Sequence, residues 1–519
     1  MATSMTADSR MQERVFAYLT DPAAHPLIHR IDTHAASVFL EGDRALKIKR
    51  AVRFPYLDYS TLQKRKAACD EEMRINRQFA PQLYRRVVPI TQSNNGALDI
   101  GGDGTPVEYA IEMTRFDERQ TFDHLAKAGL PDPALVDAVA DTIAASHLNA
   151  PLAPAEPWIA SIPAFIVGNA KAFRTAACFA KSAVDDLGDA SLSAFSRIRE
   201  PLEWRGTHGY VRRCHGDLHL ANIVLIGGKP VLFDAIEFDP DIASVDVLYD
   251  LAFPTMDFIR YGRRAAANAV LNRYLRKTSI DNLDALSALP LFMSLRAAIR
   301  ANVLLARLGR TGRDQADVME SARAYFELAH QLIHPPAPTL VAAGGLSGTG
   351  KSVLARALAP DVTPQPGAVL LRSDVLRKQL FQVSETDRLP ESAYQPQVTE
   401  QIYETLGQRA ARILSQGHSV VVDAVFARET ERAAIRDAAH KLSTRFVGLF
   451  LVTDLATRLN RVGHREADAS DATPEIAGLQ EKYNTGAVDW SVVDASGTPG
   501  QTLKQCQTRI AHCEAAQAR

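Results

Sequence analysis

The feature that most constrains the fold is a phosphate-binding motif in the second half of the chain. Residues 340–358 read LVAAGGLSGTGKSVLARAL, in which G-x-x-x-x-G-K-S stands between an apolar run and a helical pattern. Such a loop works between a strand and a helix, because its backbone N–H groups and the helix N-terminus must both face the phosphates. Lys351 is expected to reach the β and γ phosphates of ATP, and the Ser352 hydroxyl is expected to ligate Mg²⁺. The expected nucleotide-binding residues are Gly345, Gly348, Gly350, Lys351 and Ser352.

The sequence around and after this motif alternates apolar runs with helical patterns. Apolar runs at 340–345, 368–371 and 446–452 are separated by segments with helical periodicity. Continuous apolar strands of this kind are typical of a parallel sheet that helices cover on both faces. Residues 341–519 are therefore expected to form an α/β P-loop domain with a parallel sheet.

Two carboxylates bear on what this domain does with a nucleotide. Asp423 ends the apolar run VVVD, where a carboxylate that helps to hold Mg²⁺ belongs. Ala424 follows it, so the adjacent glutamate that activates water in many motor ATPases is missing. Asp374 and Arg377 follow another apolar run, and a helix that starts there would place them on one face. Such a pair can orient an acceptor hydroxyl and hold its negative charge.

Arg461 and Arg465 stand one helical turn apart and precede the polar segment 467–472. This composition suits a lid whose guanidinium groups close over a phosphate in transfer. The alternative for these arginines, and for Asp374 and Arg377, is a solvated charged helix face.

A second group of polar residues lies in CHGDLHLANIVLIGGKPVLFDAIEFD, residues 214–239. The pattern predicts a β-hairpin. Its first arm, turn and second arm are expected at 223–226, 227–230 and 231–233. The outer ends of the two arms lie side by side, so Asn222 and Asp234 become neighbours whose oxygens suit Mg²⁺ carrying ATP phosphates. Asp217 is close enough to accept a proton from a hydroxyl. A polar hairpin with merely solvated carboxylates is the alternative.

The order of residues in this segment is that of the protein-kinase catalytic loop, H-R-D-L-x-x-x-N followed by an aspartate on the next strand, with Gly216 in place of arginine. Together with VDVLYDLAF at 245–253, it resembles the aminoglycoside and choline phosphotransferases, small-molecule kinases with the eukaryotic-kinase fold. The resemblance implies an α+β protein-kinase-like domain of two lobes. It also implies Asp217 as the catalytic base, Asn222 and Asp234 as magnesium ligands, and His215 and Asp250 as supports of the loop.

The same resemblance implies a phosphate-binding lysine in the small lobe. Lys47, in the strand ALKIK, would fill this role, paired with Glu72 on a charged helix expected over 61–79. Lys49 points to the same face of the strand, because side chains alternate with a period of two, and it competes for the role. The sequence departs from protein kinases in two ways: the glycine-rich strand turn is absent, and Asp234 is not followed by Phe-Gly.

The P-loop, RSDVLRK at 372–378 and LNRVGHR at 459–465 resemble the small P-loop kinases, which include gluconate and adenylyl-sulfate kinases, zeta toxins and polynucleotide 5′-hydroxyl kinases. This resemblance implies that Asp374 is a general base, that Arg377 binds the acceptor, and that Arg461 and Arg465 are lid arginines. The whole chain resembles a bacterial fusion of an aminoglycoside-phosphotransferase-like domain with a P-loop kinase called an AAA family ATPase.

Three prolines within four residues in HPPAPTL mark a boundary between the two parts, because prolines cannot continue a helix. The expected ranges are 1–29 for an N-terminal segment, 30–116 for a small kinase-like lobe, 117–333 for a helical lobe, 334–340 for a linker and 341–519 for the P-loop kinase domain.

These patterns predict a two-site ATP-dependent phosphotransferase that uses ATP and Mg²⁺ and moves the γ-phosphate to hydroxyl groups of small molecules. Two alternatives stay open. One is a nucleotide-operated regulatory or toxin-related module with one catalytic and one ATP-sensing site. The other is a nucleic-acid 5′-hydroxyl kinase.

Composition narrows the expected partners. The 519 residues include 59 Lys and Arg and 60 Asp and Glu. This balance of charge argues against a long nucleic acid or an anionic membrane as a partner. Five cysteines without C-x-x-C spacing favour neither a disulfide framework nor a thiolate zinc site, and so favour the cytoplasm. The apolar runs fall short of the roughly 18 residues that span a bilayer, and the N-terminus lacks a hydrophobic signal core.

Overall fold

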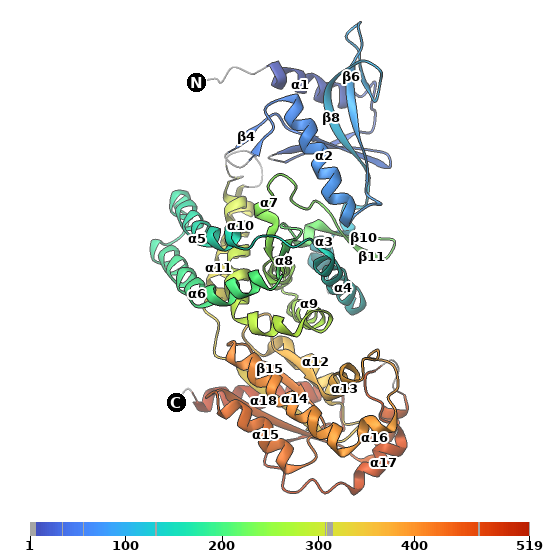
Figure 1. Cartoon of the computed structure of the whole chain (residues 1–519), viewed down its shortest axis with the longest axis vertical. Helices are drawn as coiled ribbons and strands as arrows, with labels where there is room; N and C mark the ends of the chain where they lie inside the picture. Colours follow the sequence, from blue (N-terminus) through green and yellow to red (C-terminus); the bar gives the residue numbers. More distant parts are fainter. Residues whose placement is uncertain are drawn as a thin grey trace. The chain divides into compact units, whose positions relative to one another are not determined.

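The computed structural model describes residues 7–33, 35–54, 57–129, 132–306, 308, 315–464 and 468–517. The chain clusters into two compact units, and Figure 1 labels their helices and strands. Unit 1 comprises Met1–Ile162 and Glu203–Asp257, and unit 2 comprises Pro163–Leu202 and Phe258–Arg519. The domain ranges expected from the sequence, with a boundary at 334–340, remain a prediction.

Unit 1 contains a six-stranded antiparallel sheet with the order β1-β2-β3-β8-β6-β7. Its strands are β1 (His29–Asp32), β2 (Ala36–Glu41), β3 (Arg44–Lys49), β6 (Tyr84–Gln92), β7 (Leu98–Ile100) and β8 (Thr105–Thr114). A short hairpin, β4 (Arg53–Phe54) and β5 (Leu57–Asp58), leads to α2 (Leu62–Phe79). The Thr61 hydroxyl caps α2 by accepting the Lys64 N–H, as Thr does at many helix starts. The charged helix expected over 61–79 is therefore present.

Helix α1 (Ala7–Leu19) is part of the small-lobe core. Its buried side chains Val15 and Phe16 pack in one cluster with Phe39 and Leu46 of the sheet. The Gln12 side chain donates to the Lys49 carbonyl at 2.9 Å. The residues that precede the first strand are thus tied to the strand that carries Lys47.

The rest of unit 1 is mainly helical around a second hairpin. Its elements, including three helices (α5, α6 and α8) that are shared with unit 2, are α3 (Phe122–Ala128), α4 (Pro133–Asn149), α5 (Glu156–Ala176), α6 (Lys181–Thr207), β9 (Val211–Arg213), η2 (Leu220–Asn222), β10 (Ile223–Ile226), β11 (Lys229–Leu232), α7 (Pro240–Ala243), β12 (Ser244–Asp246) and α8 (Val247–Arg260).

The β10–β11 hairpin lies where the sequence predicts it, but its turn is shorter than expected. Gly227 and Gly228 have φ values of 56° and 77°, which suit the two central residues of a tight hairpin turn. Ile226 therefore pairs with Lys229, and the second arm begins two residues earlier than predicted. The assignment of Lys229 and Pro230 to the turn was wrong, because two glycines suffice to reverse the chain.

Unit 2 is built on a five-stranded parallel sheet with the order β14-β15-β13-β16-β17. The strands are β13 (Thr339–Gly345), β14 (Val369–Arg372), β15 (Val420–Asp423), β16 (Arg445–Val452) and β17 (Ser491–Asp494). The helices that follow β13 are α12 (Lys351–Leu358), α13 (Ser373–Leu380), α14 (Pro396–Ser415), α15 (Glu429–His440), α16 (Leu455–Gly463), α17 (Pro474–Leu479) and α18 (Pro499–Gln517). All seven residues of β13 are buried. The α/β part of the predicted fold class is thus confirmed, and unit 1 combines an antiparallel sheet with helices, as the α+β part predicts.

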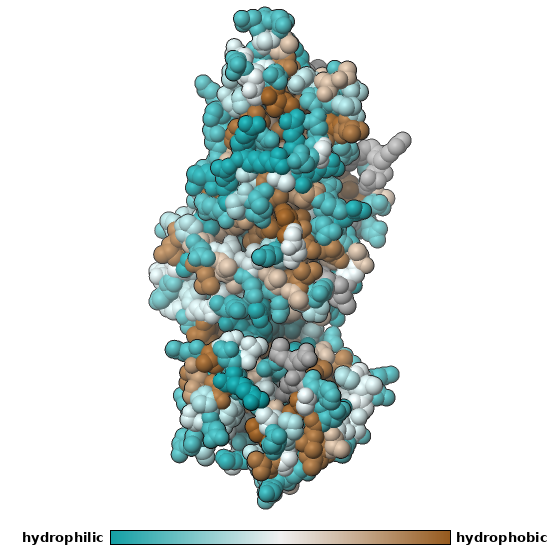
Figure 2. All heavy atoms as spheres, turned by 90° about the vertical axis from the view of Figure 1, so that its right-hand side faces the viewer, coloured by the Kyte–Doolittle hydropathy of each residue, from teal (hydrophilic) through white to brown (hydrophobic). Residues whose placement is uncertain are grey.

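Unit 2 also contains helices that precede the sheet in the sequence, among them α9 (Arg264–Lys277), η3 (Ile280–Ala288), α10 (Leu289–Leu305) and α11 (Gln315–Ile333). Within the described residues, Ile280–Leu305 is the one segment long and apolar enough to cross a membrane, and 61% of its apolar window is buried in the protein. It therefore packs as a core segment. On the face shown in Figure 2, hydrophobic residues form small groups among hydrophilic ones, as on most folded proteins.

Candidate active sites

Lys47 on β3 is the centre of a charged network in unit 1. Its Nζ lies 2.8 Å from Oε1 of the buried Glu72 on α2, and it also contacts Oδ1 of Asp234, two residues after β11. Burial disfavours the ammonium, but the carboxylates of Asp234 and Glu72 outweigh it and hold the pKa of Lys47 well above its usual value. Partial loss of hydration disfavours the Asp234 carboxylate, but Lys47 outweighs this effect, so the pKa of Asp234 lies below its usual value. The two groups form a charged pair.

Lys49, the competing lysine, has different partners. Its ammonium contacts Glu237 and the second oxygen of Glu72. The Tyr59 hydroxyl donates to Glu237 at 3.1 Å and completes this network. Only 5% of the Lys49 side chain is exposed, against 14% for Lys47. Of the two lysines, Lys47 is the one that contacts Asp234.

The predicted magnesium ligands and base meet at the start of the hairpin. The Phe233 N–H donates to the Asn222 carbonyl at 3.0 Å, which sets Asn222 beside the end of the second arm, as expected. The Asn222 amide nitrogen donates to the Asp217 carbonyl at 2.9 Å, which leaves its Oδ1 as the atom with metal-ligand chemistry. The side chains of Asp217 and Asp234 are 41% and 42% exposed, so both carboxylates are open to a substrate.

The two predicted supports, His215 and Asp250, contact the loop. The Asp250 carboxylate accepts the N–H groups of Gly216 at 3.0 Å and of His215 at 3.2 Å. The His215 ring donates through Nε2 to the Phe233 carbonyl at 2.9 Å. Complete burial lowers the pKa of His215, which favours the neutral ring. Both ends of the segment 215–233 are therefore held by buried polar groups.

Sequence reasoning missed Asn76 on α2. This fully buried side chain accepts the Ala235 N–H at 2.7 Å and donates to the Ala235 carbonyl at 3.1 Å. The preceding residue, Asp234, has a φ of 62°, a left-handed conformation that few non-glycine residues adopt. Such conformations persist where surrounding contacts enforce them. Asn76 and Tyr84, whose hydroxyl accepts the Asp234 N–H at 3.3 Å, supply those contacts.

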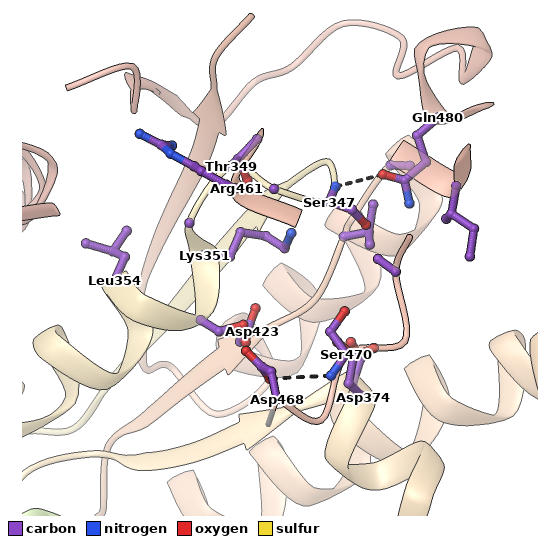
Figure 3. A pocket seen from close by; sticks show the side chains of 18 of the residues that line it. Ser347, Thr349, Lys351, Leu354, Asp374, Asp423, Arg461, Asp468, Ser470 and Gln480 are labelled. Atoms are coloured by element: carbon purple, nitrogen blue, oxygen red, sulfur yellow. Dashed lines mark hydrogen bonds between the residues drawn. The ribbon is translucent and has the colours of Figure 1, made fainter. Parts of the chain in front are cut away.

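The second site is a cavity of about 1260 Å³ in unit 2 (Figure 3). Its walls bring together residues from β15, α12, α13 and α16 and from the loops between them. The predicted site residues that line it are Gly348, Gly350, Lys351, Ser352, Asp374, Arg377, Asp423 and Arg461. Gly345 ends β13 instead, with a φ of 134°. The cavity thus joins the predicted phosphate loop to the predicted acceptor residues.

The P-loop has the shape that its glycines require. Gly348 has a φ of 86°, and a Cβ there would lie 2.6 Å from the Arg458 carbonyl oxygen. The fully buried Arg458 donates through Nε to the Ser347 carbonyl at 2.8 Å and so holds the loop against α16. The Ser347 N–H donates to the Gln480 side chain at 2.7 Å (Figure 3). Lys351 donates to the Leu346 carbonyl at 3.0 Å, so its ammonium lies across the loop.

Asp374 and Asp423 face the cavity from neighbouring strand ends (Figure 3). Arg372 lies between two carboxylates: its Nε is 3.2 Å from Asp423, and its Nη2 is 2.7 Å from Asp468. Burial, together with the nearby Asp423 carboxylate, raises the pKa of Asp374 above its usual value, although Arg372 and Lys351 act in the opposite direction. A carboxylate with a raised pKa is a stronger proton acceptor than an ordinary aspartate.

Arg377 lies one turn after Asp374 on α13, as predicted, and both line the cavity. Its Nη1 donates to the Ala393 carbonyl, and its guanidinium lies 4.9 Å from the Tyr394 ring centre. Its Nε has no hydrogen-bond partner among the described residues. The arginine is therefore fixed in place at the wall of the cavity.

Of the two predicted lid arginines, the structure places one. Arg461 lies on α16, lines the cavity and donates to the Gly497 carbonyl at 3.1 Å. Arg465 lies outside the described residues. The polar segment after it is anchored: Asp471 accepts hydrogen bonds from Lys378 at 2.7 Å and from the Tyr394 hydroxyl at 2.6 Å. The composition of the polar segment did not predict these contacts, because Lys378 comes from α13 and Tyr394 from the loop that follows α13.

Residues 340–483 match the family model described as AAA domain. An uncharacterized protein of Mycobacterium tuberculosis (strain ATCC 25618 / H37Rv) is 28% identical over 481 residues, which cover 89% of this chain and 92% of that protein.

Solved structures resemble separate parts of the chain. A gluconokinase from Sinorhizobium meliloti 1021 is 19% identical, with a TM-score of 0.25, and the match covers 34% of this chain and 93% of that one. A choline/ethanolamine kinase family protein from Mesorhizobium loti is 12% identical, with a TM-score of 0.36, and the match covers 62% of this chain and 99% of that one. The family match thus falls on the part of the chain that carries the P-loop.

Proposed function

We propose that the protein is a two-site ATP-dependent phosphotransferase that moves the γ-phosphate of ATP to hydroxyl groups of small molecules. The observation that carries this proposal is the cavity of unit 2, which is lined both by Lys351 and Ser352 of α12 and by Asp374 and Arg377 of α13. A donor and an acceptor can therefore meet in one space. Proximity of this kind is the main contribution that kinases make to phosphoryl transfer.

In the P-loop site, the backbone N–H groups of the loop and the N-terminus of α12 would bind the phosphates of ATP. Ser352 and Asp423 have the oxygen donors that Mg²⁺ prefers, and the bound ion would neutralise phosphate charge. The oxygen of the acceptor hydroxyl would bond to the γ-phosphorus while the bond from the γ-phosphorus to the ADP oxygen breaks. Asp374 would accept the proton that the hydroxyl loses. Arg377 holds the acceptor, and Arg461 and Arg465 neutralise charge on the migrating group.

Transfer to an acceptor is favoured over hydrolysis in this site. The residue after Asp423 is Ala424, which is 1% exposed, so no carboxylate stands there to activate water. Asp374 instead lies at the start of α13, where it lines the cavity together with Arg377. A base at this place receives a proton from a bound hydroxyl more readily than from water held at Asp423.

In unit 1, Lys47, held by Glu72, would bind the ATP phosphates, and Asn222 and Asp234 would hold Mg²⁺. Asp217 would receive the proton of a second acceptor hydroxyl. The lysine and the two hairpin ends come from different lobes, and the contact between Lys47 and Asp234 brings them together. This contact supports a second phosphate-transfer site.

ATP use and the free cysteines Cys69, Cys178, Cys214 and Cys506 suit a cytoplasmic protein. The near-balanced charge suits small acceptors and makes a long nucleic acid or a membrane an unfavourable partner.

The test is an untargeted search for acceptors. The full-length protein is incubated with γ-labelled ATP, Mg²⁺ and a metabolite extract, and labelled products are identified by mass spectrometry. Wild type should label at least two products, with Lys351→Ala losing one set and Asp217→Asn losing the other. Calorimetry should find two ATP sites, of which Lys351→Ala and Asp234→Ala each remove one. Release of inorganic phosphate without any labelled product would reject the proposal.

A further inference from the structure

A cluster of two histidines and one aspartate lies in unit 2, apart from the P-loop cavity. Nε2 of His330 and Nε2 of His334 each lie 2.8 Å from the same oxygen, Oδ2 of Asp186. His330 is near the end of α11, His334 follows that helix, and Asp186 belongs to α6. The side chains are 38%, 45% and 51% exposed, in the order His330, His334, Asp186. Three side chains thus direct three donor atoms to one point that solvent can reach.

The donor atoms are those of a transition-metal site. The two histidines are four residues apart, a spacing that places both rings on one side of a helical turn, and their ring centres are 5.0 Å apart. Imidazole nitrogen and carboxylate oxygen are common zinc ligands, at about 2.0 to 2.2 Å. We propose that Asp186, His330 and His334 bind one divalent transition-metal ion, of which Zn²⁺ is the best fit, with water in the fourth position.

The geometry needs only a small adjustment to take the ion. The three donor atoms lie within 4.8 Å of one another. In a tetrahedral zinc site, neighbouring ligand atoms are about 3.4 Å apart, as follows from the ligand distances. Each histidine nitrogen would therefore move about 0.6 Å from the carboxylate oxygen, and the two nitrogens would approach each other by at most about 1.4 Å. Partly exposed side chains can make this movement by rotating, without a change in the backbone.

A second cluster with similar chemistry supports no such proposal. His147, Cys214 and Asp250 also lie close together, but all three are buried. The Asp250 carboxylate already accepts the N–H groups of His215 and Gly216. The Asp250 oxygens are thus occupied by backbone hydrogen bonds, whereas the Asp186 oxygen contacts the rings of His330 and His334.

The proposed site has a defined chemical preference and structural effect. Imidazole ligands favour Zn²⁺, Ni²⁺ and Cu²⁺, and Mg²⁺ prefers oxygen ligands and water. Mg²⁺ at the concentrations used for ATP should therefore not occupy it. A bound ion would join α6 to the segment that follows α11 and leads into β13, so it would stabilise unit 2.

The test uses the full-length protein, first treated with a chelator and then titrated with Zn²⁺ in the presence of excess Mg²⁺, which prefers oxygen ligands. Wild type should bind one Zn²⁺ at this site and melt at a higher temperature when it is bound. His334→Ala and Asp186→Asn should bind that equivalent at least tenfold more weakly. Two matched controls should bind as wild type does: Asp185→Asn, whose carboxylate instead contacts Arg174 at 2.6 Å, and His440→Ala, an exposed histidine elsewhere in unit 2.

His330→Gln, a smaller change, guards against loss of binding through misfolding, and circular dichroism before addition of Zn²⁺ should show all variants folded. Absence of a Zn²⁺ equivalent from wild type would overturn the proposal. So would Zn²⁺ binding that is equally strong in His334→Ala, His330→Gln and Asp186→Asn, because the ion would then lie elsewhere. Equal weakening in Asp185→Asn would also contradict it.

Discussion

Asn76 and Ala235 are joined by two hydrogen bonds, in which the side-chain amide of one residue pairs with both backbone groups of the other. This pairing fixes the backbone next to Asp234, whose left-handed conformation aims its carboxylate at Lys47. Helix α2 thus supports the proposed magnesium ligand through Asn76 and the proposed phosphate-binding lysine through Glu72.

Asn76→Leu should damage the unit 1 site. It leaves the buried N–H and carbonyl of Ala235 without partners, at about 1 to 3 kcal/mol for each group. Chemical denaturation should show the loss of stability, and Mg²⁺-dependent ATP binding at this site should weaken while the P-loop site keeps its affinity. Gln78→Leu, an exposed change on the same helix, is the control. Equal effects of the two substitutions would show that Asn76 has no specific role in supporting the unit 1 site.

Substitution of Lys47 should mainly lower turnover, and substitution of Lys49 should mainly lower stability. Lys47→Met removes the cation beside Asp234 and should lower turnover at the unit 1 site by about 10² or more, as loss of one charge-stabilising donor does. Lys49→Met leaves Glu237 and Glu72 buried with fewer charge partners, and breaking a buried pair costs about 3 to 5 kcal/mol. Thermal melts and single-site turnover separate the two effects. If Lys49→Met lost activity but kept its stability, Lys49 would be the phosphate-binding lysine.

Gly348→Ala should remove ATP binding from the P-loop site. The new Cβ would meet the Arg458 backbone at 2.6 Å, and the residue would have to keep a φ of 86°, so a cost of about 2 kcal/mol or more is expected. Calorimetry with ATP tests this. Gly407→Ala, in α14 where a Cβ meets nothing within 4 Å, should leave binding unchanged and stabilise the helix by up to about 1 kcal/mol. ATP affinity unaltered by Gly348→Ala would contradict the predicted phosphate position.

The P-loop site should have an acid limb in its pH profile that belongs to Asp374. Transfer needs the ionised carboxylate, and its pKa is raised above the usual 3.8 by burial and by Asp423. Activity should therefore fall, as pH decreases, at a higher pH than an exposed aspartate would give. The acceptor-dependent kcat/KM reports the pKa of the free enzyme. In Asp374→Asn the remaining activity should lose this limb, and an unshifted limb in that variant would assign it to another group.

The sequence was sufficient to predict the parts of the fold that repeat a local pattern. The P-loop strand, loop and helix, the parallel sheet and α2 are all present because apolar periodicity and glycine placement act over short distances. The hairpin was predicted, but its turn was not, since Gly227 and Gly228 alone reverse the chain.

The contacts that support the sites could not be predicted in the same way. Asn76 looks like any polar residue of a charged helix, and its partner Ala235 is 159 positions away. Arg372 contacts Asp468 across 96 positions, and Lys378 contacts Asp471 across 93. Long-range pairs of this kind depend on packing between elements, and no spacing rule in one sequence reveals them.

The most direct test of the central claim compares ATP consumption with and without an acceptor-containing metabolite extract for wild type, Asp374→Asn and Asp437→Asn, an exposed aspartate that serves as the control. To isolate the P-loop site, the comparison is made in an Asp217→Asn background, in which wild type denotes the protein with Asp217→Asn as its one change. Wild type and the control should consume ATP slowly alone and much faster with extract, and Asp374→Asn should lose about 10² to 10⁴ of the extract-dependent rate while it still binds ATP. Rapid ATP hydrolysis without extract, unchanged in Asp374→Asn, would contradict the phosphotransferase assignment.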